Sequence, residues 1–104
     1  MTCKHKPVIL KLMVAIDVKH VTERDHGWHV VSSLDSSEYH VTVDTDYYQQ
    51  LTGGQASVEE LVQASFEFLL EREPVSSIMR EFDLSLIQRY FDDYELTMQE
   101  RFSR

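Results

Sequence analysis

The sequence predicts an α+β domain in which a three-stranded antiparallel β-meander is covered on one face by C-terminal helices. Residues 8–43 alternate apolar and polar side chains at the period of two that is typical of strands. After residue 43, apolar residues recur at the spacing of a helix, and these stretches are bounded by residue types that typically begin or end helices. At 104 residues the chain has room for a single domain, 1–104, and for no second one.

The predicted strands are joined by polar stretches that can turn the chain. The polar residues from Thr22 to Gly27 are predicted to form the first turn. A second turn, centred on Asp35 and Ser36, would place His29 opposite Thr42. One face of the sheet would be strongly apolar and would need a cover. The strands are predicted over residues 8–20, 28–33 and 39–43, after a flexible stub over 1–7.

The clearest helix start is Ser57 with Glu60, a pair that forms an S-x-x-E capping box. Pro74 ends the helix that begins there, and Asp83 is placed to cap the last of the covering helices. These helices are predicted over residues 58–73, 77–82 and 84–91. A tail over 92–104 scatters apolar side chains among charges and is predicted to be a marginal helix or disordered.

Composition favours a cytoplasmic protein. The only cysteine, Cys3, excludes an intrachain disulfide, and Lys11 interrupts an apolar stretch that would otherwise suggest a signal peptide. No membrane span is predicted. The net charge of −8 disfavours nucleic acid and anionic lipid as partners, because such a field repels phosphate.

The helical half also carries a recognisable pattern. It comprises Leu51-Thr52-Gly53-Gly54, Val58-Glu59-Glu60-Leu61-Val62, the run from Ser65 to Pro74, Ser77-Ile78, Phe82-Asp83-Leu84-Ser85 and Tyr90-Phe91. With its flanks, over roughly residues 8–95, this pattern resembles a group of small uncharacterised bacterial proteins. The resemblance implies a stand-alone bacterial cytoplasmic protein, and it implies no activity, cofactor or site residue.

Histidines on neighbouring strands are candidate metal ligands. His29 and His40 would lie diagonally on the outer face of the sheet, within side-chain reach, and Asp17 on the adjacent strand could join them. The alternative is a solvated histidine patch, since a register change of one residue removes Asp17 from range. Strand alternation places His20 on the other face. The N-terminal Cys3 and His5 have the right residue types but lack a second pair of ligands.

The sequence lacks a catalytic constellation. Adjacent carboxylates such as Glu59 and Glu60 are explained by helix starts, and neither they nor Asp92 and Asp93 have a setting that would separate two pKa values. The interpretation therefore leans against an enzyme, and no cofactor is expected. An enzyme or small-molecule binder with a pocket between sheet and helices, walled by aromatic side chains such as Tyr39 and Trp28, is the alternative.

The leading hypothesis is a small protein-binding or regulatory module. Its acidic helices suit a partner with a basic rim, and the end of the chain offers more apolar surface than the core obviously needs. The other hypotheses are a homodimer formed along the apolar first strand and, by analogy of layout alone, an antitoxin-like regulator. The candidate partner-binding residues are Tyr90, Phe91, Tyr94, Met98 and Phe102.

Overall fold

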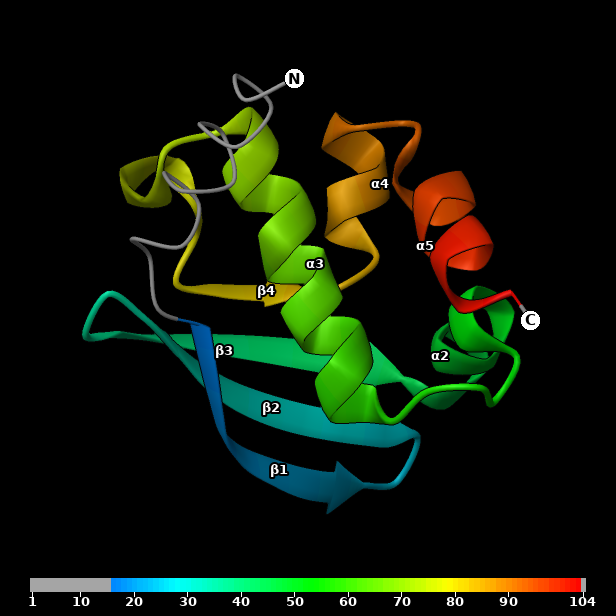
Figure 1. The fold of residues 1–104 in the computed structure, drawn as a ribbon. Coiled ribbons are helices and arrows are strands. Elements are labelled where there is room, and N and C mark those ends of the chain that lie inside the picture. Colours follow the sequence, from blue (N-terminus) through cyan, green and yellow to red (C-terminus); the bar gives the residue numbers. More distant parts are fainter. Residues whose placement is uncertain (1–15, 104) are drawn as a thin grey trace.

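A computed structural model describes residues 16–103 and shows an α+β fold in two layers (Figure 1). Helix α3 lies across one face of a four-stranded sheet, with α4 and α5 beside it on the same side, whereas the opposite face carries no helix from this part of the chain. The strands are β1 (Ile16–Arg24), β2 (Gly27–Leu34), β3 (Ser37–Asp44) and β4 (Glu81–Asp83). The helices are α2 (Thr45–Thr52), α3 (Val58–Arg72), the 3₁₀ turn η2 (Val75–Ser77), α4 (Leu86–Tyr90) and α5 (Tyr94–Phe102).

The sheet is mixed, with strand order β1-β2-β3-β4. The first three strands are antiparallel neighbours, as predicted, whereas β4 pairs parallel to β3. Asp35 and Ser36 both have positive φ angles, 52° and 75°, which is the backbone of a two-residue hairpin turn. This turn sets His29 opposite Thr42, so the predicted register of the second hairpin is confirmed.

Strand β1 differs from its prediction. Residues 8–15 of the predicted strand lie outside the described residues, and the strand continues through Thr22 to Arg24, where a turn was expected. A register shift between Val18 and His20 adds a residue to β1. Because of this bulge, His20 pairs with Val31 and lies on the outer face, not on the inner face that strict alternation indicates.

The helix predicted over residues 77–82 is wrong. The chain instead forms η2 and then the strand β4, in which Phe82 lies opposite Val41. Backbone hydrogen bonds tie this segment to β3 on both sides, from His40 N to Arg80 O and from Leu84 N to Thr42 O. Hydrogen bonding to the free edge of β3 thus prevails over the local preference of this segment for a helix. The extended backbone still buries Phe82 in the core.

The helix predicted over residues 84–91 is shorter in the structure, at Leu86–Tyr90. Asp83 does not cap it. The Asp83 carboxylate accepts hydrogen bonds from the backbone N and the hydroxyl of Ser85, which makes a turn ahead of the helix.

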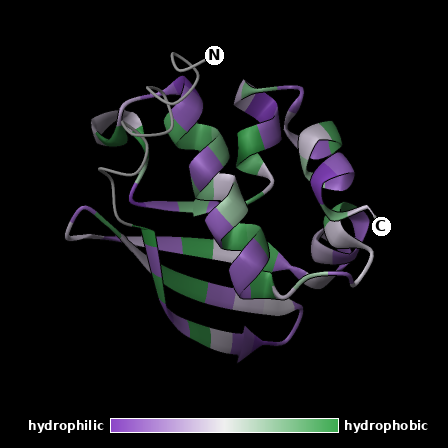
Figure 2. Ribbon diagram, viewed as in Figure 1, coloured by the Kyte–Doolittle hydropathy of each residue, from purple (hydrophilic) through white to green (hydrophobic). Residues whose placement is uncertain are grey.

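Helix α3 is the main cover of the sheet and begins at the predicted capping box. Ser57 Oγ accepts from Glu60 N, and the Glu60 carboxylate accepts from Ser57 N. Apolar and polar residues alternate along β1 to β3 and recur along α3 (Figure 2), so one side of each element faces the shared core.

The tail is helical and completes the core. In α5, Tyr94 is fully buried and Met98 is 1% exposed. The Tyr94 ring packs edge-to-face on Phe68, with ring centroids 5.2 Å apart, and the helix also contacts α2. Residues 94–102 are therefore part of the domain and not a disordered extension.

Candidate functional site

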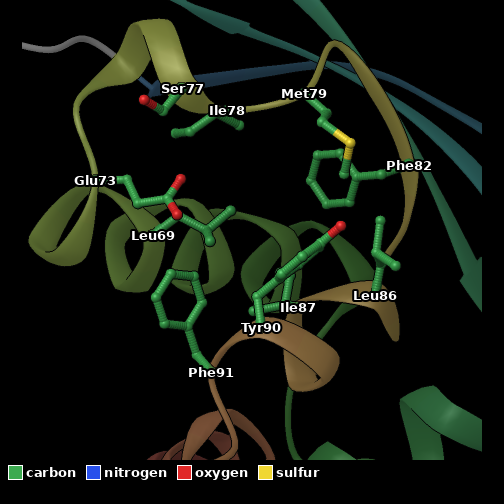
Figure 3. Close-up of a pocket in the computed structure, with 10 residues that line it drawn as sticks. All are labelled: Leu69, Glu73, Ser77, Ile78, Met79, Phe82, Leu86, Ile87, Tyr90 and Phe91. Carbon is green, nitrogen blue, oxygen red and sulfur yellow. The ribbon is translucent and has the colours of Figure 1, made fainter.

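An apolar groove of about 210 Å³ opens between the C-terminal end of α3, the η2–β4 connection and α4 (Figure 3). Its floor is formed by buried side chains that belong to the core, among them Ile78, Phe82 and Ile87. Eight of its ten lining residues are apolar or aromatic. The full lining is Leu69, Glu73, Ser77, Ile78, Met79, Phe82, Leu86, Ile87, Tyr90 and Phe91.

The rim of the groove exposes large apolar side chains. Tyr90 is 66% exposed and Met79 is 44% exposed, whereas the third strongly exposed large apolar residue of the described chain, Leu96 at 59%, lies on α5 outside the groove. Scattered exposed apolar residues are normal on a protein surface. Two of them on the rim of one concave apolar site are typical of a binding surface.

Glu73 is the one carboxylate in the lining. It directly follows α3, and its carboxylate turns into the groove near Leu69 and Ile78 (Figure 3). Within residues 16–103 its side chain makes no hydrogen bond or ion pair. The last carbonyls of α3 add partial negative charge at the same place. The groove therefore combines an apolar floor with an uncompensated negative rim.

Arg72, the cation next to Glu73 in the sequence, makes its contacts with other residues. The Arg72 guanidinium lies 3.6 Å from the centroid of the Phe68 ring, and its Nη2 atom donates to the Asp93 carboxylate at 2.8 Å. It also meets Glu71 at 3.5 Å. These contacts leave Arg72 fully engaged at the junction of α3 and α5, so it does not neutralise Glu73.

The predicted partner-binding residues separate into two groups. Tyr90 and Phe91 line the groove, whereas Tyr94 and Met98 are buried in the core and Phe102 packs against it. The latter three thus do not form the continuous exposed surface with Tyr90 that the sequence suggested. Glu73 and Met79 complete the site. Neither could be assigned to it from the sequence, because the groove depends on the unpredicted path of residues 75–83.

A second cluster lies on the outer face of the sheet, where His29 and His40 meet. His29 Nε2 and His40 Nδ1 are 3.1 Å apart, and the two rings are stacked with an interplanar angle of 21°. The outer nitrogens of this pair also have neighbours. Arg24 Nη2 lies 3.4 Å from His29 Nδ1, and Glu38 Oε1 lies 3.5 Å from His40 Nε2.

These contacts form a polar chain across three strands with one consistent assignment of protons. A carboxylate only accepts and a guanidinium only donates. Glu38 therefore favours a proton on His40 Nε2, which leaves His40 Nδ1 free to accept from His29 Nε2. His29 Nδ1 in turn accepts from Arg24.

The remaining metal candidate does not join the histidines. Asp17 lies opposite Ser33, four residues along β2 from His29, which corresponds to roughly 13 Å. Over residues 16–103, no group of three or more histidine, cysteine, aspartate or glutamate side chains is arranged to hold a metal ion. Cys3 and His5 lie outside the described residues.

The aromatic residues that were expected to wall a pocket instead pack against other side chains. Trp28 meets Tyr48 edge-to-face at 5.1 Å, and Tyr39 meets Phe66 at 5.8 Å. Tyr47 donates a hydrogen bond to Glu95 at 2.9 Å, and its burial, together with this bond, raises its pKa well above the ordinary value. The groove opens at a different place, between helices and β4.

In comparisons with known proteins, no protein family, curated protein or solved structure matches this chain. The resemblance in the sequence pattern thus stays a prediction. No helix in the described part of the chain is both long and apolar enough to cross a bilayer.

Proposed function

We propose that the protein is a small cytoplasmic protein-binding module and that its groove takes one large apolar side chain of a partner segment that also carries a basic residue. The observation that carries this proposal is an apolar floor combined with the unpaired carboxylate of Glu73. A cavity of about 210 Å³ suits a single anchor residue, and buried anchors of this kind dominate binding energy in protein interfaces.

Charge supports the same partner. The chain carries a net charge of −8, and one further acid, Asp92, follows directly after the groove residue Phe91. A lysine or arginine near the anchor would meet Glu73 and would be attracted by the wider field. An acidic partner would be repelled on both counts.

Peptide selection tests the proposal directly. A displayed library of random twelve-residue peptides, selected against the intact chain, is expected to enrich a leucine, phenylalanine or methionine with a lysine or arginine within one helical turn. The strongest peptide, resynthesised, should shift the ¹H–¹⁵N amide signals of α4 and of residues 73–79. Enrichment without this charge pattern, or shifts confined to another surface, would contradict the proposal.

Matched variants locate the binding surface. Tyr90→Asp and Glu73→Lys should each weaken binding of the selected peptide by about tenfold or more, which corresponds to at least 1.4 kcal/mol. Leu96→Asp places the same charge on a comparably exposed residue outside the groove and should leave the affinity unchanged. Equal losses in Leu96→Asp and Tyr90→Asp would show that net charge, not the groove, decides binding.

A small cationic amphiphile is the second candidate ligand, because the same floor and carboxylate suit it. A fragment screen by NMR separates the two. Amine-bearing aromatic fragments that bind the groove more tightly than any selected peptide would favour the small molecule. A homodimer remains a further prediction, supported by the position of β1 at the edge of the sheet that residues 16–103 form.

A further inference from the structure

We propose that His29 and His40 form an open, two-nitrogen site for a divalent transition-metal ion on the outer face of the sheet, separate from the groove. The site consists of His29 Nε2 and His40 Nδ1, which are 3.1 Å apart. Water fills the remaining coordination positions, since the described residues offer no third ligand.

The separation of the two nitrogens fits one shared ion. Each nitrogen lies about 2.0–2.1 Å from a bound zinc ion, so nitrogens 3.1 Å apart subtend an angle of about 100° at the metal. This angle lies between the square-planar and tetrahedral values that copper, nickel and zinc adopt. The metal would take the place of the hydrogen bond between the two rings, after each ring turns so that its nitrogen lone pair points about 40° away from the line that joins the two nitrogens.

The surroundings of His40 already resemble those of a metal ligand. Glu38 Oε1 faces His40 Nε2 at 3.5 Å and so directs the lone pair of Nδ1 towards His29. A carboxylate behind a ligating histidine fixes its tautomer and raises its basicity. Glu81, the register partner of His40 on β4, adds a second negative charge on the same face.

His29 needs one adjustment, because its ligating nitrogen now carries the shared proton. That proton moves to Nδ1, and the Arg24 guanidinium turns away from Nδ1. The contact that this breaks is exposed and long, at 3.4 Å, so its loss has a small cost.

The backbone holds the two rings in place before any ion binds. Both histidines lie within the confirmed register of the β2–β3 hairpin, where His29 pairs with Thr42 and His40 with Val31. A chelate formed from such preorganised ligands loses little conformational entropy on binding. Imidazole selects zinc, nickel or copper over magnesium or calcium, which prefer oxygen.

Zinc titration of a Cys3→Ser/His5→Gln background tests the site without interference from the N-terminal pair. Calorimetry in a non-coordinating buffer is expected to show saturable binding of one Zn²⁺ per chain, unaffected by excess Mg²⁺. Long-range ¹H–¹⁵N spectra of the imidazoles should show the largest shifts at His29 Nε2 and His40 Nδ1. Absence of saturable binding, or shifts at other ring nitrogens, would overturn the proposal.

Four further variants separate the ligands from neighbouring residues. His29→Gln and His40→Gln should each weaken zinc binding by about tenfold or more, and Glu38→Gln by about tenfold. His20→Gln is the matched control, because His20 lies on the same face and is separated from His40 by Val31 in the register of the sheet. A loss in His20→Gln equal to that in His29→Gln would indicate non-specific binding to the histidine face and would reject the chelate.

Discussion

At the residue scale, the buried hydroxyl pair of Ser65 and Tyr94 ties the last helix to the main one. Ser65 Oγ donates to the Leu61 carbonyl oxygen at 2.7 Å, and so it can only accept from Tyr94 Oη, which lies at 2.7 Å. Both side chains are almost completely buried. Neither hydroxyl is left unsatisfied, which is the condition for burying polar groups without a large cost.

Burial raises the pKa of Tyr94 well above the ordinary value of about 10. The folded state therefore keeps the phenol proton at pH values where the unfolded chain loses it. The stabilisation is complete below about pH 10 and is lost progressively as the pH rises further. Tyr47, whose pKa is raised in the same direction, adds to this alkaline sensitivity.

Urea unfolding at pH 8 and pH 11 tests this prediction. The native chain should lose about 1.4 kcal/mol more unfolding free energy between these pH values than Tyr94→Phe, which has no phenol to ionise at this position. Tyrosinate absorbance recorded during unfolding should rise with the loss of structure. Equal losses in both chains would mean that Tyr94 ionises normally in the folded state.

For the outer-face histidines, the pairing of His29 was predictable from the sequence, whereas the position of His20 was not. Turn chemistry at Asp35 and Ser36 fixed the pairing of His29 with Thr42, because a two-residue turn leaves a single register. The bulge that moves His20 to the outer face was not predictable. It depends on how β1 fits against β2 and has no glycine or proline to mark it.

At the scale of elements, the capping box of α3 stabilises the helix that covers the sheet. Ser57→Ala removes one of its two hydrogen bonds and should lower the free energy of unfolding by about 1 kcal/mol. Thermal and urea denaturation measure the change. Ser76→Ala, in the exposed 3₁₀ turn, is the control and should stay within about 0.5 kcal/mol of the native chain.

An unchanged stability in Ser57→Ala would indicate that the charges of Glu59 and Glu60 alone are enough to stabilise the start of α3. Ser57→Ala combined with Glu60→Ala distinguishes this case, since it removes both hydrogen bonds of the box and one charge.

Helix α3 and the segment after it were predicted with unequal success for a physical reason. The capping box and Pro74 are local signals, and they fixed α3 to within about a residue at each end. The serines before Ile78 can start a helix, which is why one was predicted through Phe82, but this segment pairs with the open edge of β3 as the strand β4. A pairing between residues so distant in sequence leaves no local pattern.

At the scale of the whole molecule, the core depends on its last helix. The sequence predicted the α+β class and the apolar inner face, but it left residues 92–104 undecided because their apolar side chains are sparse. In the structure Tyr94 and Met98 occupy the core against α2 and α3. The groove is lined by residues that precede and follow β4 in the sequence, so no single stretch of sequence contains its pattern.

Truncation after Phe91 is therefore expected to abolish cooperative unfolding and not merely to remove a surface. It deletes two fully packed side chains, each worth about 2–5 kcal/mol in large-to-small substitutions, from a domain whose stability is about 5–15 kcal/mol. Circular dichroism during heating measures the change. Removing residues 103–104 is the control and should preserve the transition; a cooperative transition in the longer truncation would contradict the packing of α5.

The parallel pairing of β4 also has a kinetic consequence. Thr42 and Asp83 are register partners, yet they are separated by about forty residues of chain, whereas the two hairpins join immediate neighbours. Closing so long a loop for a strand of three residues is entropically costly until α3 has docked. The hairpins should therefore form early in refolding and β4 late, and amide exchange pulses would find the edge of β3 protected last.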